Sequence, residues 1–158
     1  MHSVLFVCTA NICRSPMAEG VLRKRLTDGG VHEKIEVDSV GTHDYHAGEP
    51  PYPMAVAAAK RRGYEIHHLL ARLLRPADLD HFDMILAMDR ANVAHLKTIA
   101  PTRCKAKIEL LLEYGDKYHG QEVPDPYRKK AKDYDLALDM IEDGCAGLVE
   151  VLTRKPRG

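Results

Sequence analysis

The sequence has no long apolar run, and this absence excludes one class of protein. No stretch approaches the roughly 20 apolar residues that a membrane-spanning helix needs. The first residues also do not have the charged and then apolar layout of a secretion signal. We therefore expect a cytoplasmic protein that does not insert into membranes.

Net charge and disulfide potential are also lacking. Lysine plus arginine and aspartate plus glutamate number 23 each, so the formal net charge is zero and nothing favours binding to nucleic acid. Four cysteines, at positions 8, 13, 104 and 145, are too few and too scattered for a disulfide scaffold. The 158 residues suit one domain, and no internal repeat divides them, so we expect a single domain over residues 1–158.

The most informative stretch is the run CTANICRSP, residues 8–16. Apolar β-forming residues precede it and predict a buried strand over residues 4–7, so Cys8 should lie where α/β sheets bind ligands. Backbone N–H groups of the following turn would form an anion nest, reinforced by the N-terminus of the next helix. The same features favour a thiolate, so we expect Cys8 to have a depressed pKa and to act as a nucleophile.

Several side chains of this run have predicted roles of their own. The paired donors of Arg14 match two oxygens of a phosphoryl group. Ser15 can offer its hydroxyl to the thiolate of Cys8, and Asn11 tolerates left-handed backbone and can tie the loop together with its amide. We expect phosphate to be bound by Thr9, Ala10, Asn11, Ile12, Cys13, Arg14 and Ser15.

The run resembles the loop of the low-molecular-weight protein tyrosine phosphatases, which reads Cys-x-Gly-Asn-x-Cys-Arg-Ser-Pro. The resemblance implies hydrolysis of phosphotyrosine and other aryl phosphates through a cysteinyl-phosphate, with a tyrosine-phosphorylated protein as substrate and no cofactor. Ala10 stands where the family pattern has glycine. A positive φ at that position would cost an alanine about 1–2 kcal/mol.

Asp125 lies between two prolines, in the run VPDPY at residues 123–127. On its own the run is good turn chemistry, although the prolines would also hold a carboxyl in a fixed place. Because the family carries its general acid in a late Asp-Pro pair, the resemblance implies that role for Asp125. It also implies that Tyr45 and Tyr127 wall the substrate cleft.

The residue after Tyr127 departs from the family pattern. Arg128 stands where many relatives have a second aromatic residue, which leaves the substrate preference open. It begins a basic cluster, residues 128–130, beside the predicted acid. Two interpretations remain open, a solvated face and a contact for an acidic substrate.

Oxidation and metal binding are two further possibilities that the cysteines and nine histidines raise. Cys13 shares the loop with Cys8, so oxidation could join the two reversibly, or Cys13 could simply pack beneath the loop. The histidine pairs 43/46 and 67/68 have no organising helix or second ligand pair, and the two loop cysteines have no partner pair. The sequence therefore predicts no metal site.

Two other functions compete with phosphotyrosine hydrolysis. An arsenate reductase of the same fold would need further cysteines close together, whereas Cys104 and Cys145 are isolated in the sequence. A non-catalytic phosphopeptide-binding module would be expected to lose Cys8 or Asp125, and this chain has both.

Strand and helix patterns alternate along the chain. We expect helices over 16–26 and 54–62, one of about eleven residues that Asp89 caps, and a last one from residue 133. Segment 64–74 is ambiguous, and the long loop 113–132 is of a kind that tends to be functional. One face of the last helix should be lined by Leu136, Met140, Leu148 and Leu152, with Ala137, Ile141 and Val149 beside them.

The strand patterns fall at residues 4–7, 35–39, 82–88 and 106–112. Strands that alternate with helices predict a parallel sheet covered on both faces. The expected fold class is α/β: a small four-stranded parallel sheet with helices on both faces and a phosphate loop after the first strand.

Overall fold

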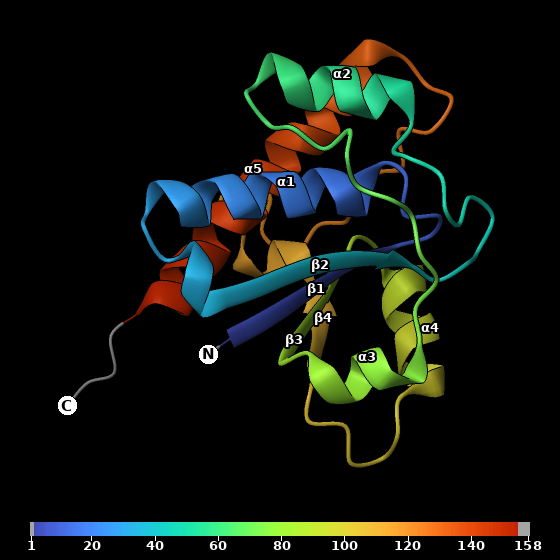
Figure 1. The fold of residues 1–158 in the computed structure, drawn as a ribbon. Coiled ribbons are helices and arrows are strands. Elements are labelled where there is room, and N and C mark those ends of the chain that lie inside the picture. The colour runs from blue at the N-terminus through green and yellow to red at the C-terminus, as the bar shows by residue number, and fades with distance from the viewer. Residues whose placement is uncertain (1, 155–158) are drawn as a thin grey trace.

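A computed structural model, which describes residues 2–154, contains one sheet with the strand order β2-β1-β3-β4 (Figure 1). Its strands are β1 (His2–Cys8), β2 (Ile35–Gly41), β3 (Met84–Ala87) and β4 (Lys107–Leu110). All three pairings are parallel, and β1 is hydrogen-bonded along both of its edges. The predicted four-stranded parallel sheet is confirmed.

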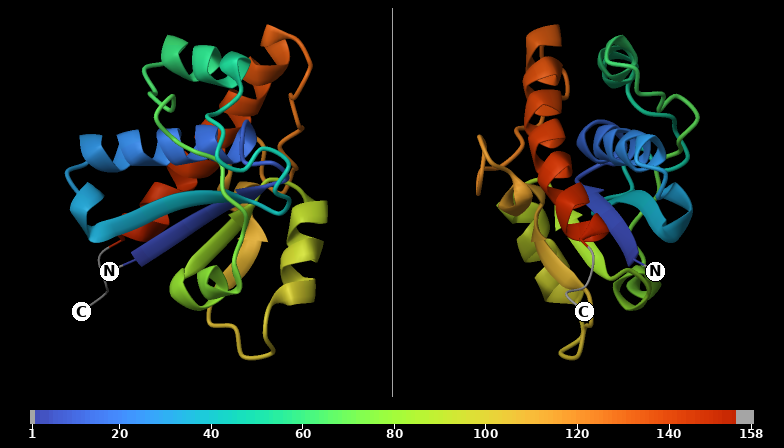
Figure 2. Two further views of the ribbon diagram at one scale, coloured as in Figure 1. Left: turned by 45° about the vertical axis from the view of Figure 1, so that its right-hand side comes forward. Right: turned by 90° about the vertical axis from the view of Figure 1, so that its left-hand side faces the viewer.

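Helices cover both faces of this sheet, also as predicted. They are α1 (Arg14–Asp28), α2 (Pro53–Arg61), α3 (Pro76–His81), α4 (Arg90–Ile99) and α5 (Ala131–Thr153). Figures 1 and 2 show α1, α2 and α5 on one face and α3 and α4 on the other. None of the helices within residues 2–154 is long and apolar enough to cross a membrane.

The core is divided by the sheet into two clusters. Because side chains alternate along a strand, Val4, Phe6 and Cys8 of β1 belong to the cluster under α1 and α5, whereas Leu5 and Val7 belong to the cluster under α3 and α4. This two-sided burial explains why β1 reads as a continuous apolar run.

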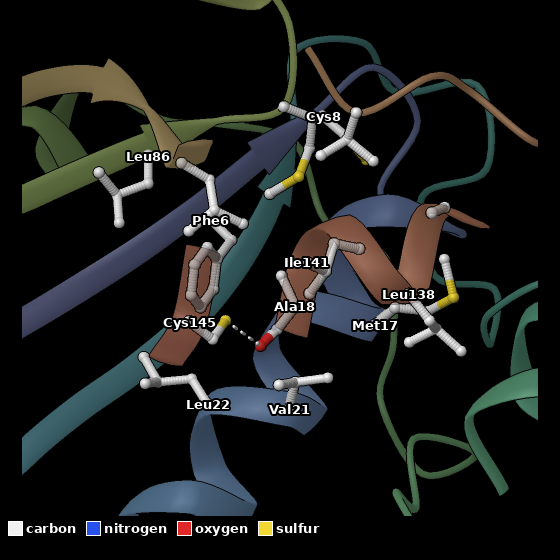
Figure 3. Packing of buried hydrophobic residues seen from close by; sticks show 14 of the residues in the cluster. Phe6, Cys8, Met17, Ala18, Val21, Leu22, Leu86, Leu138, Ile141 and Cys145 are labelled. Atoms are coloured by element: carbon white, nitrogen blue, oxygen red, sulfur yellow. Dashed lines mark hydrogen bonds between the residues drawn. The ribbon is translucent and has the colours of Figure 1, made fainter. Parts of the chain in front are cut away.

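The isolated cysteines are packing residues within these clusters. Figure 3 shows Cys145 among Phe6, Leu22 and Ile141, with its thiol donating to the carbonyl oxygen of Ala18 at 4.0 Å. Burial raises the pKa of the Cys145 thiol to about 12. Cys104 is half-buried against the other cluster.

Several predicted boundaries differ from the structure. The fourth strand ends at Leu110 and continues as the 3-10 helix η2 (Leu111–Tyr114), and the last helix begins at Ala131. Helix α3 was not predicted, although Pro76 in its first turn and the bond from the Arg75 N–H to Asp78 Oδ2 (2.8 Å) are ordinary start signals.

The predicted apolar face of the last helix is wrong in one residue. Met140, Leu148 and Leu152 are buried, but the Leu136 side chain is 42 % exposed. Leu136 lies at the edge of the apolar stripe of α5 and lines an open groove beside Pro124 instead of the core.

Candidate active site

The cysteine loop, residues 8–15, lies at the carboxyl end of the central strand. Cys8 is the last residue of β1 and α1 begins at Arg14, so the loop joins a buried strand to a helix N-terminus. Backbone N–H groups of Thr42, His43 and Tyr52 each donate to a loop carbonyl oxygen, all at 2.9 Å. The segment that follows β2 therefore fixes the loop on its outer side.

Gly41, the last residue of β2, makes this close approach possible. A Cβ atom at position 41 would lie 2.8 Å from the carbonyl oxygen of Thr9 and 3.0 Å from the carbonyl carbon of Ala10. Because both are backbone atoms, they have little freedom to move away, and only glycine lets the loop pack against β2 in this way.

Polar contacts inside the loop position the Cys8 thiol. The Ser15 hydroxyl lies 2.9 Å from Cys8 Sγ, and Asn11 Nδ2 donates to Ser15 Oγ at 2.8 Å and to Ser39 Oγ at 3.0 Å. Asn11 has a φ of 59°, and its Oδ1 accepts from the Arg72 N–H at 3.0 Å. Asn11 thus adopts the left-handed backbone that its residue type tolerates and links three segments.

Ala10 does not have the positive φ that would strain it, since Asn11 and Arg128 are the positive-φ residues other than glycine within residues 2–154. The replacement of the family's glycine therefore carries no backbone penalty of that kind at this position. Ala10 lines the same cleft as Cys8.

Arg14 is 2 % exposed and is held by two fixed acceptors. Its Nη1 donates to Asp89 Oδ2 at 2.7 Å and to the carbonyl oxygen of Val123 at 3.0 Å, and its Nη2 lies 3.8 Å from Asp125 Oδ2. Burial by itself would lower the pKa of Arg14, but the neighbouring Cys8 and Asp89 raise it overall. A permanent cation therefore lies beside the thiol.

Asp89 binds Arg14 at the site, whereas the sequence interpretation considered a place at the edge of the site and preferred helix capping alone. As predicted it caps α4, with its Oδ1 accepting from the Asn92 N–H at 2.8 Å, but its other oxygen binds Arg14. A signal for this was available, because a parallel pairing of this strand with the first one places the residues just after it, Asp89 among them, at the edge of the sheet where Cys8 lies.

Asp125 reaches the cysteine loop from a distant part of the sequence. A cleft of about 240 Å³ is lined by Cys8, Thr9, Ala10, Ile12, Cys13, Arg14, Tyr45, His46, Asp125 and Tyr127. The Val123 N–H donates to the carbonyl oxygen of Met88 at 2.8 Å, which ties the segment that carries Asp125 to the end of β3. Asp125 Oδ1 accepts from the Tyr127 N–H at 3.1 Å, and its side chain is half-exposed.

Aromatic side chains line the mouth of this cleft. Tyr127 is half-buried and makes edge-on contacts with Tyr52 (centroids 5.1 Å apart) and His46 (5.9 Å). Tyr45 is 68 % exposed and stacks on His43 at 5.0 Å. The sequence interpretation named the two predicted wall residues, Tyr45 and Tyr127, but not the supporting Tyr52, His43 and His46.

Cys13 is a second buried thiol in the cleft. Its Sγ lies 3.9 Å from the hydroxyl of Tyr134, and burial raises the pKa of its thiol to about 12. Cys104 and Cys145 do not line the cleft. Within residues 2–154, no group of three or more His, Cys, Asp or Glu side chains is placed to hold a metal ion.

Comparison with known proteins gives one consistent result. The family model described as low molecular weight phosphotyrosine protein phosphatase matches residues 3–157. The low molecular weight protein-tyrosine-phosphatase YfkJ of Bacillus subtilis is 37% identical over 155 residues, 98% of each chain, and the corresponding Homo sapiens phosphatase is 40% identical over 150 residues, 94% of each.

A solved structure agrees with these relatives. The Entamoeba histolytica protein tyrosine phosphatase with Hepes in its active site superimposes with a TM-score of 0.92 at 36% identity, covering 96% of this chain and 97% of that one. The resemblance found in the cysteine loop is therefore confirmed over nearly the whole chain, and with it the prediction of a phosphatase. The chain belongs to the low molecular weight phosphotyrosine protein phosphatase family.

Proposed function

We propose that this protein hydrolyses phosphotyrosine in proteins, and other aryl phosphate monoesters, through a cysteinyl-phosphate intermediate. The observation that carries the proposal is the convergence of Cys8, Arg14 and Asp125 on one cleft of about 240 Å³. A nucleophile, a fixed cation and a carboxyl group are the parts that phosphoryl transfer from an aryl ester needs.

In the first step, Cys8 Sγ attacks phosphorus in line with the departing phenol oxygen. Arg14 and the N–H groups of the cysteine loop bind the equatorial oxygens, where charge develops in the transition state. Asp125 donates its proton to the phenol oxygen as the P–O bond breaks, and an S–P bond forms. The Ser15 hydroxyl, 2.9 Å from Sγ, stabilises the thiolate before attack.

In the second step, water releases the phosphate. Asp125, now ionised, takes a proton from the water as its oxygen bonds to phosphorus and the S–P bond breaks. Cys8 leaves as a thiolate, again stabilised by Ser15. Asp89 and the Val123 carbonyl hold Arg14 in place through both steps.

The aromatic mouth of the cleft suits a phenyl ring. Tyr127, supported by Tyr52, and Tyr45, supported by His43, offer ring faces and edges on which an aromatic leaving group can pack. We propose that these walls select phosphotyrosine over phosphoserine, whose short alkyl chain would leave the aromatic surface uncovered.

Substitution of the nucleophile and the acid tests the mechanism. We expect Cys8→Ser to abolish turnover of p-nitrophenyl phosphate while a phosphate analogue still binds. Asp125→Ala should lower kcat/KM more for phenyl phosphate than for p-nitrophenyl phosphate, because kcat/KM reports the step in which the phenol leaves and the poorer leaving group depends more on protonation. Asp80→Ala, an exposed aspartate on α3, is the matched control. Equal losses for both esters would count against Asp125 as the acid.

The same assay separates the two alternative functions. A phosphopeptide-binding module would bind phosphotyrosine peptides without releasing phosphate. An arsenate reductase would consume a thiol in the presence of arsenate, and its relay would need a cysteine near the cleft besides Cys13. Neither Cys104 nor Cys145 lies there, so we expect phosphate release and no arsenate-dependent thiol oxidation.

A further inference from the structure

The residue after the cleft wall, Arg128, has an unusual backbone conformation. Its φ is 62°, in the left-handed region that residues other than glycine, asparagine and aspartate seldom adopt. The turn is closed by the Lys129 N–H, which donates to the carbonyl oxygen of Pro126 at 2.9 Å. Backbone strain of this kind collects at functional sites, where the surrounding structure holds it in place.

This conformation sets the Arg128 side chain over the aromatic wall. The guanidinium carbon lies 5.2 Å from the centroid of the Tyr127 ring, within the range of a cation–π interaction. The ring in turn packs on Tyr52. The Arg128 guanidinium therefore lies beside the cleft and packs on a ring that Tyr52 supports.

The charge of this cation is not neutralised by the protein. Within residues 2–154, no carboxylate lies within 4 Å of the side-chain nitrogens of Arg128, Lys129 or Lys130, all of which are exposed. Most of the other arginines in residues 2–154 do form ion pairs with carboxylates; they are Arg14, Arg23, Arg61, Arg62, Arg72, Arg75 and Arg90.

The nearest carboxylates of the cleft mouth do not pair with this cluster. Asp44, next to the wall residue Tyr45, is exposed, and Glu49 is held 2.6 Å from His46, whose ring contacts Tyr127. The cations of residues 128–130 are therefore available to a carboxylate of a bound peptide.

We propose that Arg128, aided by Lys129 and Lys130, recognises an acidic side chain flanking the phosphotyrosine, so that the enzyme prefers acidic phosphorylation sites. This proposal rests on the proposed function and adds to it a class of substrate sequence. An arginine suits the task because its planar donors match a carboxylate in a bidentate manner while it stacks on an aromatic ring.

Two phosphotyrosyl peptides that differ only in their flanks test the proposal. One has glutamates on both sides of the phosphotyrosine and the other has glutamines, and the readout is the ratio of their kcat/KM values. We expect the wild type to favour the acidic peptide by about three- to tenfold at 50 mM salt and by less at 300 mM, because exposed charges are screened.

Three variants locate the preference. Arg128→Gln should lower the acidic-to-neutral ratio by about threefold or more, whereas Arg128→Lys should restore part of it. Arg103→Gln is the matched control, because this exposed arginine precedes β4 and so lies at the end of the sheet opposite to the end that carries Cys8. The acidic-to-neutral ratio of this variant should equal that of the wild type.

The outcomes also separate this proposal from the one it rests on. If the wild type hydrolyses neither p-nitrophenyl phosphate nor the peptides, the proposed function fails. If the wild type hydrolyses both peptides with equal kcat/KM, or if Arg128→Gln and Arg103→Gln give the same ratio, the recognition role of Arg128 is refuted while the hydrolytic function stands.

Discussion

At the scale of single residues, Asp89 shows how one carboxylate serves two elements at once. One oxygen caps α4 and the other binds Arg14 at 2.7 Å. The two roles are separable, because asparagine caps a helix about as well as aspartate but cannot offer a charged acceptor to a guanidinium.

The substitution Asp89→Asn keeps the cap but leaves the buried Arg14 without its charged acceptor, so the free energy of unfolding should fall by about 1.5–3 kcal/mol. It should lower kcat/KM for p-nitrophenyl phosphate by about tenfold or more, since a hydrogen bond to a charged group contributes about 1.5–3 kcal/mol. Urea denaturation and steady-state kinetics measure the two effects. Asp89→Ala is the companion variant and should lose about 1 kcal/mol more than Asp89→Asn, because it loses the cap as well. Unchanged kinetics in Asp89→Asn would show that Arg14 needs no partner at this position.

Cys13 is the other residue with a testable role, as a partner for Cys8 under oxidation. Peroxide would convert the Cys8 thiolate to a sulfenic acid, and the Cys13 thiol would condense with it to form a disulfide and release water. Because the pKa of Cys13 is about 12, it reacts as a protonated thiol near neutral pH, and we expect slow closure.

Peroxide inactivation of the wild type should be reversed by dithiothreitol. In Cys13→Ser recovery should be smaller, because an unprotected sulfenic acid oxidises further to forms that thiols do not reduce. Activity after timed peroxide exposure and reduction is the measurement, with Cys104→Ser as the control. The same recovery in Cys13→Ser and wild type would defeat the protective role.

At the scale of elements, the segment around α3 is fastened to the cysteine loop through Arg72. The backbone N–H of Arg72 binds Asn11, and its guanidinium binds Asp38 of β2 and Asp78 of α3. The Asp78 side chain is 3 % exposed. Burial alone would raise the pKa of Asp78, but the bonds from Arg72 and from the Arg75 N–H outweigh it and lower the pKa overall.

This lowered pKa makes the contribution of Asp78 dependent on pH. The native pKa is below the value of about 3.9 for an unfolded chain. The stabilisation is therefore fully present above about pH 5 and is lost as the pH falls through the native pKa. We expect the stability difference between wild type and Asp78→Asn to be constant from pH 7 to 5 and smaller at pH 3. Urea unfolding at these three pH values tests this, with exposed Asp80→Asn as control. A difference that stays the same at pH 3 would contradict the ionic role.

At the scale of the whole molecule, α5 closes one face of the sheet by packing its backbone against η2. A Cβ atom on Gly147 would overlap the carbonyl oxygen of Tyr114, and one on Gly144 would lie 2.8 Å from a Leu111 side-chain carbon. The long last helix therefore depends on glycines where it meets the end of β4.

Gly147→Ala should destabilise the fold. Alanine gains about 1 kcal/mol in helix propensity, but the collision is with a backbone atom, and overpacking costs about 1–3 kcal/mol or more. We expect a lower urea midpoint, with Glu150→Ala, exposed on the same helix, close to wild type. A rise in the midpoint would mean that α5 can shift away from η2 without cost.

What the sequence could predict depends on how local each feature is. The cysteine loop follows from contiguous residues, an apolar strand, a turn and a helix start, and the alternation of such units predicts the sheet. Asp125 needed the resemblance, because nothing in its Pro-Asp-Pro run names its partner. The bonds from Arg14 to Asp89 and from Arg72 to Asn11 join residues 75 and 61 positions apart, and only the packed sheet brings them together.

The central place of β1 bears on how the molecule can lose activity. This strand is paired along both edges and covered on both faces, so no partial opening of the outer elements frees its backbone. Cys8 is therefore anchored to the most stable part of the chain, and heat or denaturant should displace it only when the entire fold unfolds.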